Sequence, residues 1–191
     1  MPVGRTLVPT LAGMGLLLLG GTAQAPSVER FDLQEMTQRA EVVIHGKVQK
    51  TECRLDAKGN IVTDVKLEVG ELLKRKPGEA ADAKSFEFAV YGGIFGGRGS
   101  AVSGAPTFNQ GEEVLLFLSP VNSAGLRTCI GLSQGKYTIR LEGGKKLAYR
   151  NLEGLRIVDP KTGEVKESTG PEQGVPFDEL RERVKSHLEK R

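Results

Sequence analysis

The sequence predicts an all-β, or β-rich α+β, fold: a small antiparallel barrel with one N-terminal and one C-terminal helix packed on it. Apolar residues alternate with polar ones over residues 42–48 and again over 61–69, the pattern of strands with one buried and one wet face. The break at residues 56–60 contains Gly59, which can take the positive φ of a short hairpin loop. The core therefore opens with a long antiparallel ribbon.

Residues 1–25 have the features of a secretory signal peptide. Arg5 supplies a positive start, residues 7–19 form an apolar run, and Ala23 and Ala25 make a small-x-small cleavage site. The alternative is a membrane anchor, but the run is shorter than the ~20 residues of a spanning helix and is interrupted by proline and glycine. We expect cleavage, an extracytoplasmic (periplasmic or secreted) protein, and no membrane association afterwards.

The remaining residues, 26–191, are long enough for one domain and short for two. The formal net charge is +3 and falls to about +2 when Arg5 is removed, so no polyanionic partner is indicated. Aromatic residues make up 5% of the chain and tryptophan is absent, so base-stacking surfaces are not evident. We expect no nucleic-acid partner.

The only two cysteines are Cys53 and Cys129. Export would place them where disulfides persist, and a bridge between them would stabilise the fold by roughly 4 kcal/mol. The alternative is a reactive thiol, but neither a neighbouring histidine nor a CxxC spacing supports it. We predict the disulfide.

Two helices are expected, at the ends of the domain. Asp32, followed three residues later by Glu35, is a capping pattern that begins a short helix over 33–40. An apolar stripe predicts a C-terminal helix over 177–190. Its alternative role is membrane-surface binding, but interleaved acidic residues favour docking on the barrel.

Further strands are expected at 85–90, 114–118 and 127–132. The run 114–118 is apolar on both faces, which is typical of a central strand covered on both sides. Alternation on either side of Gly143-Gly144 predicts another hairpin. Residues 151–175 are polar and rich in turn formers.

The glycine-rich loop 92–108 is the most unusual segment. It lacks the lysine of a phosphate-binding loop, and the helix of a dinucleotide fingerprint does not follow it. A loop of this length is either a structural connection or a binding loop, and both interpretations stay open. If it binds, its large side chains are the contact residues: Ile94, Phe95, Arg98 and Phe108.

No catalytic, cofactor-binding or metal-binding constellation is evident. His45 and His187 are isolated, without the paired spacing of a zinc site. A Ser-His-Asp triad could be assembled from distant residues, but no Gly-x-Ser-x-Gly elbow is present. Glu112 and Glu113 are adjacent on a strand, so they should point to opposite faces and cannot flank one substrate bond.

Two resemblances add to this picture. Residues 39–48, the end of the ribbon at 72–74, and residues 104–118 resemble a family of exported bacterial proteins with no established activity. The short first helix, the strand with Val42-Val43-Ile44, the long second strand and the C-terminal helix are similar to the netrin-like domain of tissue metalloproteinase inhibitors. That likeness implies an OB-like five-stranded barrel flanked by helices.

The inhibitory mechanism of those proteins does not carry over. They bind the protease zinc through a cysteine at the mature N-terminus, whereas the mature chain here begins at or near Pro26 and its first cysteine is Cys53. The leading hypothesis is an exported, non-catalytic binding or interaction module that uses loop 92–108 to hold a protein or small ligand in the envelope or outside the cell. The alternatives are a secreted hydrolase of unrecognised type and a structural component of the envelope.

Overall fold

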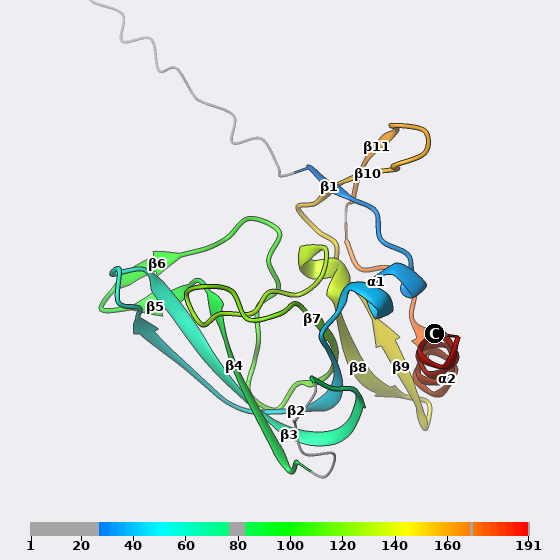
Figure 1. Ribbon diagram of the computed structural model, residues 1–191, viewed down its shortest axis with the longest axis horizontal. Helices are drawn as coiled ribbons and strands as arrows, with labels where there is room; N and C mark the ends of the chain where they lie inside the picture. Colours follow the sequence, from blue (N-terminus) through cyan, green and yellow to red (C-terminus); the bar gives the residue numbers. More distant parts are fainter. Residues whose placement is uncertain (1–26, 77–82, 169, 191) are drawn as a thin grey trace, which may run out of the picture.

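The computed structural model describes residues 27–76, 83–168 and 170–190 (Figure 1). Residues 1–25, predicted to be a signal peptide, lie outside the described part of the chain. The fold is mostly β-sheet with two helices, which confirms the predicted fold class. Figure 1 shows α1 (Leu33–Arg39) and α2 (Phe177–Glu189) together at one end and the small hairpin of β5 and β6 at the other.

Seven strands form one antiparallel sheet. In spatial order they are β12 (Val175–Pro176), β9 (Lys145–Tyr149), β8 (Lys136–Glu142), β7 (Glu113–Leu118), β2 (Val42–Leu55), β3 (Ile61–Lys74) and β4 (Ser85–Tyr91).

The predicted barrel is wrong in one respect, because this sheet is not closed. The edge strands β12 and β4 do not pair with each other. Instead, the connection after β7 curls back towards β4, where the backbone N–H of Arg127 donates to the carbonyl of Ala89 at 2.9 Å. In a closed barrel, a continuous series of backbone hydrogen bonds would join the edge strands, whereas here this hydrogen bond joins β4 to a connecting segment.

The long ribbon is as predicted, with β2 and β3 each 14 residues long. Its turn is organised by Asp56, whose Oδ1 accepts hydrogen bonds from the backbone N–H groups of Lys58 and Asn60. Gly59 takes a φ of +81° there, as the hairpin requires. Register shifts, including one between Val48 and Lys50, interrupt the ladder and let the ribbon bend.

Strand β7 is the centre of the molecule, and both of its faces are buried. One face contributes to a core made with β2, β3 and β4; the other contributes to a core made with the helices, β8 and β9. We call these the ribbon core and the helix core. The sequence prediction of a central strand covered on both sides is confirmed.

Both helices pack on the helix core. Helix α1 begins with the predicted capping box, in which Asp32 accepts from the N–H of Glu35 and Glu35 accepts from that of Asp32. The Lys74 ammonium donates to the carbonyls of Thr37, Gln38 and Ala40 at the end of α1, where a positive charge is favourable. Helix α2 is docked on the sheet by its apolar stripe of Phe177, Leu180, Val184 and Leu188.

Two sequence predictions about the second half of the chain are corrected. Residues 127–132 do not form a strand: only Cys129 makes a bridge, to Leu118, before a 3₁₀ turn η1 at Leu132–Gly135. The polar region 151–175 is more than turns, because β10 (Arg156–Val158) and β11 (Val165–Glu167) pair with β1 (Ser27–Glu29) in a separate small sheet.

Within the described residues, neither helix combines the length and the apolar character that crossing a bilayer requires.

Candidate functional site

The glycine-rich segment is a short hairpin followed by an anchored stretch of backbone. Strands β5 (Gly93–Phe95) and β6 (Arg98–Ser100) pair through Phe95 and Arg98. The turn between them consists of Gly96 and Gly97, with φ values of +56° and +75°. Two consecutive positive φ values are what a tight two-residue hairpin turn needs. Gly96 and Gly97 therefore form the turn of this hairpin.

The start of the hairpin lies directly against the end of the ribbon. The Thr63 hydroxyl donates to the carbonyl of Gly92 at 2.6 Å. Gly93 has a φ of +126°, and a Cβ there would lie 2.5 Å from Thr63 Oγ1 and 2.6 Å from Cys53 Sγ. Only glycine fits this junction, because both the backbone conformation and the close approach exclude a side chain.

After the hairpin, residues 104–112 form a segment that we call the strap, held by groups from β8 and η1. The carbonyl of Gly104 accepts from both the N–H and the hydroxyl of Ser133, at 3.0 and 2.8 Å. The carbonyl of Thr107 accepts from Lys136 Nζ at 2.6 Å. The N–H of Asn109 donates to Glu112 Oε2 at 3.2 Å.

The strongest anchor is the ion pair between Lys136 and Glu112, at 2.6 Å, with side chains only 10% and 14% exposed. Thr138 donates to the same Glu112 oxygen at 2.6 Å, so the buried carboxylate is well supplied with donors. The Lys136 ammonium also lies 5.0 Å from the centre of the Phe108 ring. Phe108 packs edge-on against Phe88 of the ribbon core, with ring centres 5.5 Å apart. The strap is thus fixed to the core at its middle.

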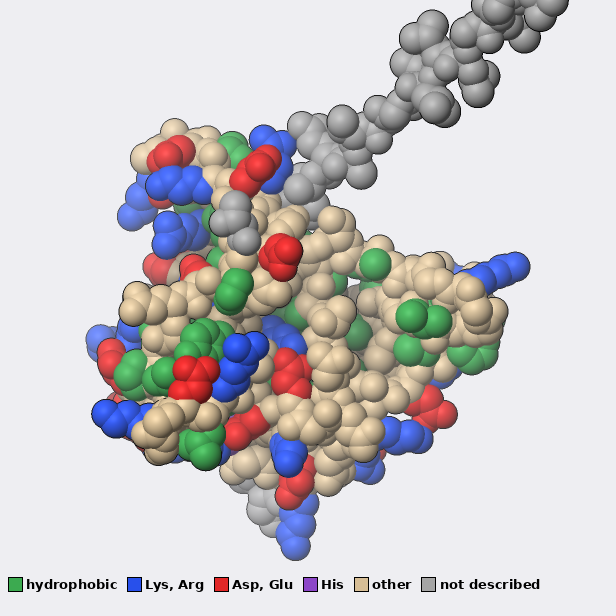
Figure 2. All heavy atoms as spheres, turned by 180° about the vertical axis from the view of Figure 1, so that it is seen from behind, with side chains coloured by type: hydrophobic (Ala, Val, Ile, Leu, Met, Phe, Trp, Pro, Cys, Tyr) green, Lys and Arg blue, Asp and Glu red, His purple; other side chains and the backbone are tan. Residues whose placement is uncertain are grey.

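Between the hairpin and the strap lies a cleft of about 370 Å³, which we call the apolar cleft. Its walls come from three places: the ends of the ribbon and β4, the hairpin, and the strap. Its lining is mostly apolar, with Tyr91, Ile94, Val102, Pro106 and Phe108 the largest contributors. Figure 2 shows hydrophobic side chains gathered on the lobe that carries this end of the molecule.

The predicted contact residues divide into two groups. Ile94 and Phe108 line the cleft, whereas Phe95 and Arg98 lie at the end of the hairpin and do not line it. Ile94 is 74% exposed, the highest value among the large apolar side chains that the structure describes. Sequence reasoning missed Thr51, Cys53 and Thr63, which reach the cleft from β2 and β3. Their period-two spacing along the ribbon was the available signal.

On the other side of the strap is a polar cleft of about 410 Å³. Ala105, Pro106 and Thr107 line both clefts, so the strap is a wall shared by the two. The polar cleft is lined in addition by Glu112, Thr138, Arg140 and several amide and hydroxyl side chains.

The disulfide predicted between Cys53 and Cys129 is not formed, and both cysteines are free thiols. Cys53 is half-buried in the apolar cleft, with its Sγ 3.3 Å from Thr63 Oγ1. Cys129 belongs to the ribbon core beside Leu118, which pairs with Val42 at the opposite end of β2 from Cys53. Complete burial raises the pKa of Cys129 to about 12, so it stays a thiol at neutral pH.

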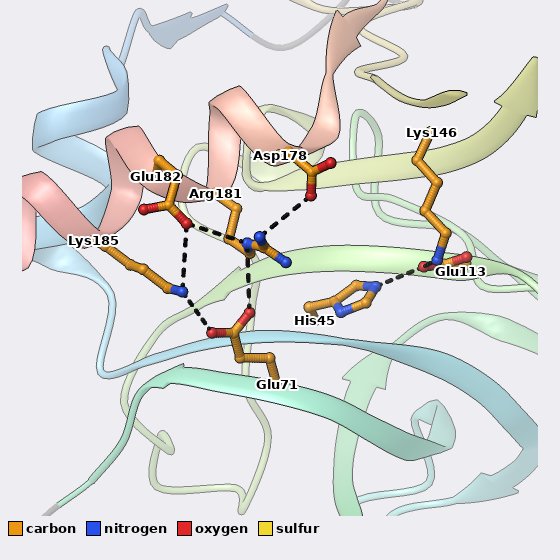
Figure 3. A network of polar contacts seen from close by, with 8 residues as sticks. All are labelled: His45, Glu71, Glu113, Lys146, Asp178, Arg181, Glu182 and Lys185. Atoms are coloured by element: carbon orange, nitrogen blue, oxygen red, sulfur yellow. Dashed lines mark hydrogen bonds and ion pairs between the residues drawn. The ribbon is translucent and has the colours of Figure 1, made fainter. Parts of the chain in front are cut away.

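His45 belongs to a polar network under α2 (Figure 3). Its Nε2 lies 2.7 Å from Glu113 Oε1, which also accepts from Lys146 at 2.7 Å. Its ring packs against Phe177, with ring centres 4.6 Å apart, and its Nδ1 faces Gly70 so closely that a Cβ there would be 2.8 Å away. Helix α2 covers the face of β2 on which His45 lies. Nε2 is thus engaged by Glu113, and Nδ1 lies against Gly70.

Glu112 and Glu113 contact different partners, as expected, although β7 begins only at Glu113 and Glu112 belongs to the strap. Figure 3 also shows Arg181 and Lys185 of α2 pointing towards Glu71 of β3, at 3.8 and 2.9 Å from its carboxylate oxygens. These contacts hold the helix to the ribbon. His187, the second histidine, lies in the last turn of α2.

No group of three or more histidine, cysteine or acidic residues suited to a metal ion occurs among the described residues. In comparisons with known proteins, no family model, no curated protein and no solved structure matches this chain.

Proposed function

We propose that this protein is an exported binding module that holds an apolar group of a partner in the apolar cleft. The proposal depends on one observation above all: a cleft of about 370 Å³ with a mostly apolar lining, open beside the exposed Ile94. Pockets that bind ligands are concave and mainly apolar with a few polar groups, and here Thr51, Thr63 and Cys53 supply those groups.

The partner that fits best is a polypeptide presenting an apolar side chain. Ile94 and Val102 both line the cleft and remain exposed, which leaves an apolar rim that a small molecule inside the cleft would not cover. Large exposed apolar side chains that lie together are typical of interaction surfaces. The anchored strap supports the same proposal, because a preformed wall reduces the entropy lost on binding.

The test compares two substitutions at equally exposed apolar residues. Ile94→Lys places a charge at the cleft, and Leu141→Lys, at a residue 73% exposed on β8, is the matched control. We expect an environment-sensitive apolar dye, bis-ANS, to bind the natural protein and the Leu141 variant, and to bind the Ile94 variant about tenfold more weakly. Envelope or secreted proteins retained by the immobilised natural chain should be lost with the Ile94 variant alone.

Equal retention of dye and partners by both variants would show that the cleft is not the binding surface. Loss with both variants would point to general surface hydrophobicity, and would equally refute the assignment.

A further inference from the structure

The two edges of the seven-stranded sheet are built differently. At one edge, β12 has only two residues, and one of them is Pro176, which has no backbone N–H to donate. At the other edge, β4 has seven residues, contains neither proline nor lysine, and pairs with β3 without a register shift. Short strands, proline, lysine and bulges are the usual features that keep a sheet edge from pairing with another chain, so β4 lacks the protection that β12 has.

The hydrogen bonds near the two ends of β4 show which of its backbone groups point away from β3. The carbonyl of Lys84 accepts from the N–H of Val69, so even-numbered residues point towards β3. Backbone direction alternates along a strand, so the N–H and C=O groups of odd-numbered residues point outward. The carbonyl of Ala89 agrees with this alternation, because it accepts from Arg127 on the outer side.

Ser85 and Glu87 therefore carry outward backbone groups that the fold does not use. Both residues are exposed, and no residue that the structure describes hydrogen-bonds to these groups. Arg127 covers the outer side of β4 only at Ala89. The N–H and C=O groups of Ser85 and Glu87, which we call the β4 edge, have the alternate spacing that an added strand needs.

Beside the β4 edge lies a groove of about 480 Å³, which we call the charged groove. It receives side chains of both signs in equal number: Lys50, Arg54 and Lys66 against Glu52, Asp64 and Glu87. They form three ion pairs whose side chains are 43–67% exposed, so the pairs contribute little to stability and can exchange partners. An apolar side chain placed over these charges would remove them from water without replacing their solvation, whereas a charged side chain would pair with them.

We propose that the β4 edge binds an extended polypeptide segment of a partner that carries charged side chains at every second position. The segment adds an antiparallel strand to the sheet, and its backbone pairs with Ser85 and Glu87. A residue opposite Glu87 points its N–H and C=O groups towards β4 and its side chain to the same face as Glu87, into the charged groove. Backbone pairing supplies affinity, and the groove selects charged side chains at those positions.

A second copy of this chain fits the β4 edge less well than such a segment. Glu87 is the single charged residue of β4, and the other residues on its face are Ser85, Ala89 and Tyr91. A second β4 strand paired at this edge would therefore place mainly uncharged side chains over the charged groove.

The test titrates the peptide acetyl-Lys-Thr-Glu-Thr-Lys-Thr-Glu-amide into the purified chain in a calorimeter, and we expect saturable binding. The same peptide with N-methyl groups on its lysine and glutamate amides keeps the charges but loses the donors that face β4. It should bind at least about tenfold more weakly. A peptide with alanine in place of the charged residues keeps the backbone donors and should bind about tenfold more weakly.

The variant Glu87→Pro localises the site. The N–H of Glu87 points outward, so its loss leaves the ladder with β3 intact, while the proline ring blocks the added strand. We expect the affinity for the first peptide to fall at least about tenfold. The matched control is Glu87→Thr, which removes the same carboxylate and its ion pair with Lys66 but keeps the N–H. Its affinity should stay within about threefold.

The proposal would be overturned by absence of saturable binding, by equal affinity for the N-methylated or the alanine peptide, or by equal losses in the two Glu87 variants. If Glu87→Pro is too unstable to measure, Ser85→Pro decides, because proline is tolerated at the first residue of a strand. Self-association of the chain in analytical ultracentrifugation that Glu87→Pro abolishes would assign the edge to a second copy and would also refute the proposal. Neither Ser85 nor Glu87 lines the apolar cleft, so this proposal and the proposed function fail separately.

Discussion

Leu115 and Leu116 are neighbours on β7 and both are fully buried, but their side chains enter different cores. Leu115 packs in the helix core and Leu116 in the ribbon core. The strand therefore contributes to both packed layers, as β2 does through Val43 on one side and Val42 and Ile44 on the other.

Truncation of either leucine should destabilise the whole fold. We expect Leu115→Ala and Leu116→Ala each to lower the free energy of unfolding by about 2–5 kcal/mol, because a cavity remains where the side chain was. Leu141→Ala, at a residue 73% exposed, should change it by less than about 0.5 kcal/mol. Urea denaturation followed by circular dichroism measures all three. A small effect at Leu115 with a large one at Leu116 would mean that the helix core contributes little to stability.

Three of the glycines in the hairpin region should differ in the stability that they lose on substitution by alanine, according to backbone conformation and available space. Gly93→Ala must place a Cβ 2.5 Å from Thr63 Oγ1 at a φ of +126°, so we expect a loss of more than about 2 kcal/mol. Gly96→Ala has open space but a positive φ, so its loss should be about 1 kcal/mol. Gly99→Ala has neither constraint and should be nearly neutral. Thermal unfolding of the three variants gives the order, and an equal response at all three sites would contradict the described junction.

The two thiols should differ in reactivity. Cys129 is fully buried with a pKa raised to about 12, and Cys53 is half-buried at the apolar cleft. Thiolates are the reactive form, so a native sample should be alkylated by iodoacetamide at Cys53 well before Cys129. In denaturant, both should react without prior reduction. Peptide mass spectrometry distinguishes the sites, and a requirement for a reductant would show that the cysteines are bridged after all.

Acid should weaken the fold partly through Glu113. Partial burial raises the pKa of Glu113, but hydrogen bonds from Lys146 and His45 outweigh it and bring the pKa below its ordinary value of 4.5. A carboxylate with a lowered pKa stabilises the folded state above its ordinary pKa, and that contribution is lost as the pH falls through the lowered value. Glu113→Gln should therefore show a smaller decrease in the free energy of unfolding between about pH 5 and pH 3 than the natural chain.

The control for that measurement is Glu179→Gln, at an exposed residue of α2 that forms no ion pair with a described residue. Its pH dependence should follow that of the natural chain. Parallel curves for the Glu113 variant and the natural chain would remove Glu113 from the account of acid stability.

The elements that could be predicted from the sequence are those in which the pattern of apolar and polar residues repeats over enough positions to be recognised. The ribbon, the doubly buried β7 and the stripe of α2 each repeat over several turns or strand positions. Strands β1, β10 and β11 have three residues each, which is too short for a period to appear. Residues 127–132 were predicted to be a strand, but there the chain only bridges β7 to β4, through Cys129 and Arg127.

The candidate site was predicted only in part, because its walls are brought together by contacts distant in sequence. The glycines drew attention to loop 92–108, and Ile94 and Phe108 do line the cleft. The strap, however, is held by Ser133 and Lys136, each 29 residues beyond its partner. No local pattern reports such a pairing. The predicted disulfide failed for the same reason, since two cysteines in strand-like surroundings say nothing about their separation across the sheet.

Because the strap is a wall shared by the apolar cleft and the polar cleft, the volumes of the two clefts are linked. Residues 105–107 border both the apolar and the polar cleft, and the Lys136 ammonium fixes them through the carbonyl of Thr107. If this backbone moved towards one cleft, that cleft would become smaller and the other would become larger. Ser133 at one end and Lys136 at the middle thus together set how the space on the two sides of the strap is divided.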